Sequence, residues 1–172
     1  GATLTEATRT FICAHNVLSV CLSVDCSLLA TGDALAKAKV WETSLGGKLL
    51  LTCDCAGWVH AIKFSGDMTM LATGDQGKQV RLWSVSSGEM VHKMELESEV
   101  FTLDLSRDKT TLTAGTKSGK ARTWFIAPRH LSSFVAGDGR DVNSIDMGFS
   151  LLATGSSGKE ASCWDYMSGE CR

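Results

Sequence analysis

The sequence predicts an all-β fold made of four copies of one antiparallel unit, and two observations carry that prediction. First, tryptophan recurs at intervals of 42, 41 and 40 residues, at Trp41, Trp83, Trp124 and Trp164. Second, the apolar residues between them alternate with polar ones or form runs of four or five, bounded by Gly, Ser and Asp. This is the pattern of short strands and not the period of a helix. A repeat of this length is typical of units that stack against copies of themselves.

The units begin at equivalent valines. From the opening valine to the tryptophan the spacing is 24, 24, 24 and 22 residues. The four units therefore span residues 17–58, 59–99, 100–141 and 142–172.

Each unit holds four short strands. In the second unit we expect strands at residues 59–65, 68–74 and 78–83. Ser65 and Asp67 supply the first turn, because short polar side chains can bond their own backbone. The glycine of each Ala-Thr-Gly sequence is expected to end the second strand. A fourth strand fits each connection, at residues 48–52, 90–95 and 131–135.

Residues 64–89, FSGDMTMLATGDQGKQVRLWSVSSGE, carry a family signature. The combination of Phe-Ser-x-Asp, Leu-Ala-Thr-Gly, Val-Arg-Leu-Trp and Ser-Gly-Glu, repeated along nearly the whole chain, resembles the WD-repeat β-propeller family. The resemblance implies a propeller of four-stranded antiparallel blades, four in this chain, in which each blade packs against its neighbours.

The chain also departs from the family pattern. Only Trp164-Asp165 keeps the Trp-Asp dipeptide, and no Gly-His turn occurs. The family usually places an aspartate six residues before the tryptophan, to bond that histidine. Those positions here hold Leu35, Gly77, Ser118 and Gly158. We therefore expect the family's buried polar network to be absent or replaced, and apolar burial to hold the blades.

The ends of the chain pose the question of how a ring would close. Residues 8–13, with Phe11 and Ile12, fit an orphan fourth strand that completes the last blade. The chain could close alone as a four-bladed ring, or be a piece of a larger or engineered propeller. Because blade angles in the family suit seven or eight blades better, we favour a two-fold homodimer of eight blades.

Composition excludes several classes of function. A net charge of -2 gives no reason to expect nucleic acid, and no apolar run approaches the ~18 residues of a membrane span. The seven cysteines follow neither the repeat nor a zinc-ligand spacing. We expect structural thiols, no metal, and an intracellular (cytoplasmic or nuclear) reducing compartment.

Catalysis leaves little trace in the sequence. The histidines occupy unrelated register positions, at His15, His60, His92 and His130. The segment from Gly115 to Lys120 does not have the spacing of a phosphate-binding loop and recurs as a hairpin turn. We expect neither an enzyme nor a cofactor.

Binding is the better prediction. The resemblance places the residue before each opening valine near the top face of the propeller, at Asn16, Trp58, Glu99 and Asp141. An exposed Trp58 would anchor a partner. Glu99 and Asp141, with Glu95 and Glu97, would favour a basic peptide, unless they form an ordinary solvated rim. We expect a non-enzymatic interaction scaffold with an unknown protein or peptide partner; the alternative is a purely structural, self-assembling ring without a ligand.

Overall fold

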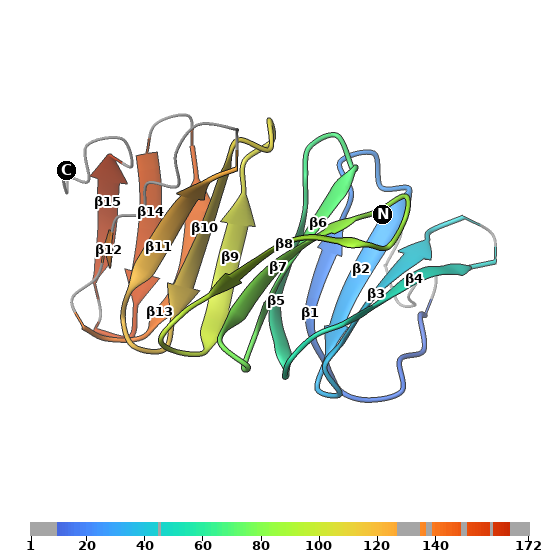
Figure 1. Cartoon of the computed structure of the whole chain (residues 1–172), viewed down its shortest axis with the longest axis horizontal. Coiled ribbons are helices and arrows are strands. Elements are labelled where there is room, and N and C mark those ends of the chain that lie inside the picture. Colours follow the sequence, from blue (N-terminus) through green and yellow to red (C-terminus); the bar gives the residue numbers. More distant parts are fainter. Residues whose placement is uncertain are drawn as a thin grey trace, which may run out of the picture.

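In the computed structural model, four antiparallel sheets stand side by side in a row (Figure 1). The structure describes residues 10–44, 46–126, 135–136, 139–148, 151–158 and 160–165. We call the sheets blades 1 to 4 in chain order. Among the described residues, no helix is long and apolar enough to cross a bilayer.

The blades share one strand order. Blade 1 consists of β1 (Val17–Leu22), β2 (Leu28–Asp33), β3 (Lys37–Glu42) and β4 (Leu49–Asp54). Blade 2 consists of β5 (Val59–Phe64), β6 (Met70–Asp75), β7 (Gln79–Ser84) and β8 (Met90–Glu95). Blade 3 consists of β9 (Val100–Leu105), β10 (Thr111–Thr116), β11 (Ala121–Phe125) and β12 (Val135–Ala136). The described part of blade 4 consists of β13 (Val142–Met147), β14 (Leu151–Ser156) and β15 (Ala161–Asp165).

These strands confirm the prediction of four antiparallel units. The predicted strand at residues 90–95 is β8, and the one at 48–52 lies within one or two residues of β4. Of the predicted strand at 131–135, residues 131–134 lie outside the described part of the chain. The first turn is also confirmed, because Ser65 donates to the Asp67 carboxylate at 2.8 Å. The same bond recurs from Ser106 to Asp108 at 2.7 Å.

Successive blades interlock through a valine and a glycine. A Cβ added to Gly32 would lie 2.5 Å from Val59 Cγ1, and one added to Gly74 would lie 2.5 Å from Val100 Cγ1. The opening valines of blades 2, 3 and 4 thus pack onto the bare backbone of the blade before them. The second strand ends one residue later than expected, at Asp33 in β2 and Asp75 in β6, so Gly32 and Gly74 still lie within their strands. A side chain there would displace the next blade.

The tryptophans are held by threonines on the neighbouring strand of the same blade. The indole N–H donates to a threonine hydroxyl at 3.0 Å in three blades, as Trp41–Thr31, Trp83–Thr73 and Trp164–Thr154. Blade 3 reverses the order of its threonine and alanine, so Ala114 stands where the acceptor would be. There Thr113 instead pairs with Thr123 at 2.8 Å.

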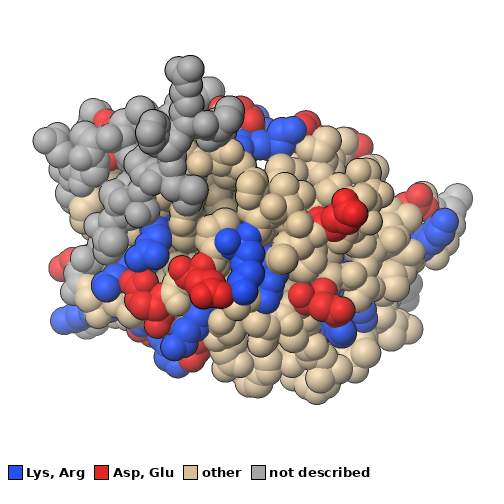
Figure 2. All heavy atoms as spheres, viewed as in Figure 1, with Lys and Arg blue, Asp and Glu red and all other residues tan. Residues whose placement is uncertain are grey.

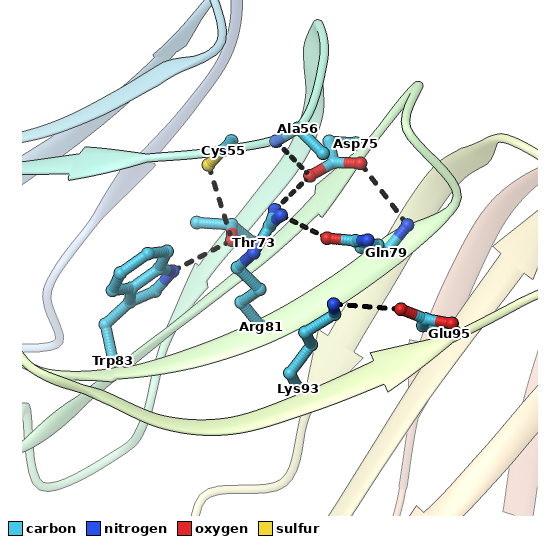
Figure 3. Close-up of polar contacts among 9 residues, drawn as sticks. All are labelled: Cys55, Ala56, Thr73, Asp75, Gln79, Arg81, Trp83, Lys93 and Glu95. Carbon is cyan, nitrogen blue, oxygen red and sulfur yellow. Dashed lines mark hydrogen bonds and ion pairs between the residues drawn. The ribbon is translucent and has the colours of Figure 1, made fainter.

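Two cysteines extend this network to the chain segment that precedes each of the first two blades. Cys55, at the end of β4, donates its thiol to Thr73 in blade 2 at 3.8 Å (Figure 3). Cys13 donates to Thr31 at 3.6 Å in the same way. In blades 1 and 2 a Trp–Thr–Cys chain therefore takes the place of the family's polar network. The prediction that the cysteines ignore the repeat was wrong for this pair, which lies 42 residues apart.

The row of blades is open at both ends (Figure 1). Val20 on β1 is 64% exposed, whereas its equivalent Ile62 on β5 is 7% exposed. Ala153 on β14 is exposed, whereas its equivalent Ala30 on β2 is fully buried. The difference arises because, among the described residues, no blade covers blade 1 on one side or blade 4 on the other. The described blades thus form an open row in this structure and not a closed ring.

Residues 10–13 form no strand in this single chain, and residues 8 and 9 lie outside the described part; the strand at residues 8–13, which would complete a last blade, stays a prediction. The segment has no strand beside it to pair with, since blades 1 and 4 stand at opposite ends of the row. The Phe11 ring packs against Trp41 at 5.9 Å between centroids. Ile12 is strongly exposed.

Candidate interaction surface

The four residues predicted to lie on the top face occupy one edge of the row. Each backbone carbonyl accepts an N–H from the turn between the second and third strands of the same blade. These bonds measure 2.9–3.0 Å and run from Ala34 to Asn16, from Gln76 to Trp58, from Lys117 to Glu99 and from Ser157 to Asp141. The four positions are therefore structurally equivalent, one in each blade.

Trp58 is the apolar centre of this edge. Its side chain is 47% exposed and meets the His60 ring edge-on, with centroids 6.2 Å apart. His60 in turn lies 5.4 Å from Phe101 of blade 3, again edge-on. The pKa of His60 is lowered, and burial of the ring is the largest cause. The three rings form a continuous patch across the junction of blades 2 and 3, which we call the aromatic patch.

Of the four predicted residues, only Trp58 belongs to the aromatic patch; Asn16 and Asp141 lie on the end blades. His60 and Phe101 were missed by sequence reasoning. The signal was present, because each directly follows the opening valine of its unit. Aromatic rings at equivalent positions of adjacent units are brought together wherever adjacent blades stack.

The carboxylates near the patch are paired within the chain. Glu99 pairs with Lys117 at 3.3 Å, and Lys117 also stands over the Phe101 ring at 6.0 Å. Glu97 pairs with Lys120 and Arg122, both at 3.2 Å. Glu95 pairs with Lys93 at 2.8 Å. On the face seen in Figure 2, acidic and basic side chains lie interspersed, with no large patch of one sign among the described residues of that face. This pairing favours a solvated rim over a site for a basic peptide.

A buried ionic hub lies close to the base of Trp58. Asp75 is fully buried and accepts the Ala56 N–H at 3.1 Å and the Gln79 N–H at 3.3 Å (Figure 3). Its carboxylate also pairs with Arg81, which donates to the Gln79 side-chain oxygen. The bond to Ala56 fixes the connection that leads into Trp58. Asp75 therefore holds in place the backbone from which the Trp58 ring of the aromatic patch projects.

The described residues contain no group of three or more His, Cys, Asp or Glu side chains arranged to hold a metal. Burial raises the pKa of Cys53 to about 12 and that of Cys55 to about 11. Such thiols remain protonated near neutral pH and are poor nucleophiles or ligands. Both pack as apolar side chains at the junction of blades 1 and 2.

The first half of the chain matches a family model. The model for the WD domain, G-beta repeat, matches residues 6–42 and 47–84. This chain contains two WD40 repeats. The second match begins before β4 and ends with β7, so the family's repeat starts with the outer strand of one blade and continues through three strands of the next. Blade 3 and the described part of blade 4 continue the same strand order. No curated protein sequence matches the chain significantly.

WD40 repeats are commonly protein-interaction scaffolds and are typically non-enzymatic. When the two matches are aligned, residues 10–13 correspond to residues 52–55, at the end of β4. The contacts agree with this alignment, because Cys13 meets Thr31 as Cys55 meets Thr73.

Proposed function

We propose that this WD40-repeat chain is a non-enzymatic interaction scaffold that binds a protein or peptide partner at the aromatic patch. The carrying observation is Trp58, a large aromatic side chain that stays half-exposed beside the fully buried Val59. Tryptophan is one of the three residue types enriched among the side chains that contribute most to binding at protein interfaces.

The chemistry of the surroundings narrows the partner. Because Glu99, Glu97 and Glu95 each have a basic partner in the chain, these three carboxylates do not form an unpaired acidic cluster that would attract a basic segment. Trp58, His60 and Phe101 offer edges and faces of rings to an apolar or aromatic side chain. The Glu99–Lys117 pair beside them can meet polar backbone groups. We therefore propose an uncharged segment with a hydrophobic anchor as the ligand.

Selection from a displayed peptide library tests this proposal with the whole chain as bait. We expect selected peptides to share an aromatic or large aliphatic residue and to bind Trp58→Ala at least tenfold more weakly. Val91→Ala is the matched control, because Val91 is an equally exposed apolar residue on β8. Peptides that bind Trp58→Ala as well as the unaltered chain would refute the patch as the site.

A second candidate function is structural, and the open ends of the row favour it. We propose that two chains form a two-fold homodimer of eight blades, as a self-assembling ring. In this ring the segment containing Phe11 and Ile12 would supply a fourth strand to the partner's last blade. The exposed β1 supports the proposal, since its equivalents on β5 and β9 are covered.

A further inference from the structure

We propose that blade 1 of a second copy of this chain docks onto the open face of blade 4 through the same contacts that join blade 1 to blade 2, and that two copies close in this way. The inference rests on the second candidate function and specifies its interface. Four features of the end blades carry it.

The first feature is the apolar face of β1. Val17 is 44% exposed, whereas the opening valines of blades 2, 3 and 4 are at most 1% exposed. Val20 and Leu22 are likewise exposed, whereas their equivalents Ile62 and Phe64 are buried. In blades 2 to 4 this face packs on the preceding blade. Blade 1 therefore presents a face whose shape and chemistry are those of a blade junction.

The second feature is a matching recess on blade 4. Within the chain, Val59 packs over Gly32, flanked by the fully buried Ala30 and Ala38. Blade 4 carries Gly155, Ala153 and Ala161 at the same register positions. Ala153 and Ala161 are exposed. The small residues that receive a valine elsewhere thus stand uncovered on the last blade.

The third feature is a serine that donates a hydrogen bond from one blade to the next. Ser19 donates its hydroxyl to the Val59 carbonyl at 2.9 Å across the junction of blades 1 and 2. Ser144 holds the same register position in β13, where it pairs with Gly155 as Ser19 pairs with Gly32. In both pairs the serine Oγ lies 2.5 Å from a Cβ added to the glycine. The equivalent acceptor is the Val17 carbonyl of the second copy.

The fourth feature is an aspartate that reaches the next blade. Asp104 on β9 accepts the backbone N–H of Met147 on β13 at 3.0 Å, and it pairs with Lys63 on β5 at 3.0 Å. Asp146 is the equivalent of Asp104 and is exposed at the open end of the row. Leu22 is the equivalent of Met147. Docking would let Asp146 accept the Leu22 N–H of the second copy.

The segment around Phe11 fits the same arrangement. Phe11 is the equivalent of Cys53, 42 residues later. Phe11 packs against Trp41 of blade 1, and Cys53 belongs to the same buried cluster as Trp83 of blade 2. Residues 10–13 thus hold the place beside blade 1 that the end of β4 holds beside blade 2. In the docked arrangement this place is next to β15, the outermost described strand of blade 4.

A second copy is the occupant that these features select, because the two complementary faces belong to one chain. Each copy offers one β1 face and one β13–β15 face. In a closed arrangement of two copies, each β1 face is covered by the β13–β15 face of the other copy. An arrangement that does not close would grow into a filament.

Mass measurement by light scattering tests the docking with the 172-residue chain. We expect twice the 18.4 kDa of one chain. Ala153→Arg and Val20→Asp each disrupt one face at a position that is exposed in the single chain, so each variant is expected to fold and to have the mass of one chain. Val91→Arg, on the exposed outer strand β8, is the control and should keep the doubled mass.

Mixing the two variants gives a sharper result. A pair of Ala153→Arg and Val20→Asp chains contains one unaltered junction and one junction with opposite charges, so the doubled mass should return. Far-UV circular dichroism checks that each variant is folded. If one variant is unfolded, the mass of the other variant alone tests the docking.

Three results would overturn the proposal: an unaltered chain with the mass of one copy at micromolar concentration, long polymers, or a dimer that both variants leave intact. The last result would leave the two-chain ring standing while removing this interface. Trp58→Ala should not change the mass, so failure of the peptide site and failure of the docking are distinguishable.

Discussion

The indole N–H of Trp83 donates to the hydroxyl of Thr73 at 3.0 Å, and both side chains are buried. The same hydroxyl receives the thiol of Cys55 from the preceding blade. One threonine thus joins the third strand of its own blade to the fourth strand of its neighbour (Figure 3). The bond matters because a buried donor without an acceptor retains its full desolvation cost.

Replacing Thr73 with Val should therefore destabilise the chain by about 1–3 kcal/mol, since the shape is kept while the Trp83 N–H loses its acceptor. Urea unfolding followed by tryptophan fluorescence measures the change. Thr52→Val, on the exposed side of β4, is the matched control and should shift the midpoint little. Equal midpoints for the two variants would show that the Trp–Thr bond contributes nothing.

The strands could be predicted from the sequence because their signal is local. Alternation of apolar residues and the turn residues Ser65 and Asp67 fix where β5 ends, and the structure agrees. The contacts between blades could not be predicted in the same way. Cys55 and Thr73 meet only because two blades stack, and nothing near either residue in the sequence records that contact. The repeat itself held the clue, in the 42-residue spacing of Cys13 and Cys55.

The candidate site was predicted in part. The position of Trp58 at the edge of its blade follows from its place before the opening valine. The same backbone hydrogen bond in every blade shows that all four such residues hold equivalent positions, whereas binding there stays a prediction. The acidic character expected of Glu99 is offset by Lys117, which stands 18 residues later in the turn of the same blade. Charge pairing of this kind depends on how the turn folds back, which composition does not reveal.

Replacing Gly74 with Ala should destabilise the junction of blades 2 and 3. The added Cβ would lie 2.5 Å from Val100 Cγ1, a side chain that is fully buried and has no room to move. Overpacking of this kind costs about 1–3 kcal/mol. Gly148→Ala is the control, because the nearest atom to its added Cβ is the Leu151 oxygen at 3.7 Å. Urea midpoints of the two variants decide the matter, and a Gly74→Ala chain as stable as the control would contradict the interlock.

The cysteines should differ in reactivity. Burial raises the pKa of Cys53 to about 12 and that of Cys55 to about 11, so both thiols are protonated at pH 8. Cys26 is exposed in the turn before β2. Brief treatment with iodoacetamide at pH 8, followed by peptide mass spectrometry, should label Cys26 first and leave Cys53 and Cys55 unmodified until urea is added. Early labelling of Cys53 in the folded chain would contradict its burial at the junction of blades 1 and 2.

His60 should make the stability of the fold depend on pH. Burial lowers its pKa in the folded chain below the ordinary value of 6.5, so the unfolded chain takes up a proton more readily than the folded chain does. The contribution to stability is therefore present above pH 6.5 and is lost as the pH falls through the lower pKa of the folded state. Urea midpoints measured at pH 7.5 and pH 5 should fall more for the unaltered chain than for His60→Gln, which cannot titrate. His92→Gln is the control, because His92 is exposed on β8 and should leave the pH dependence unchanged. A pH dependence that survives in His60→Gln would place its origin elsewhere, in the carboxylates.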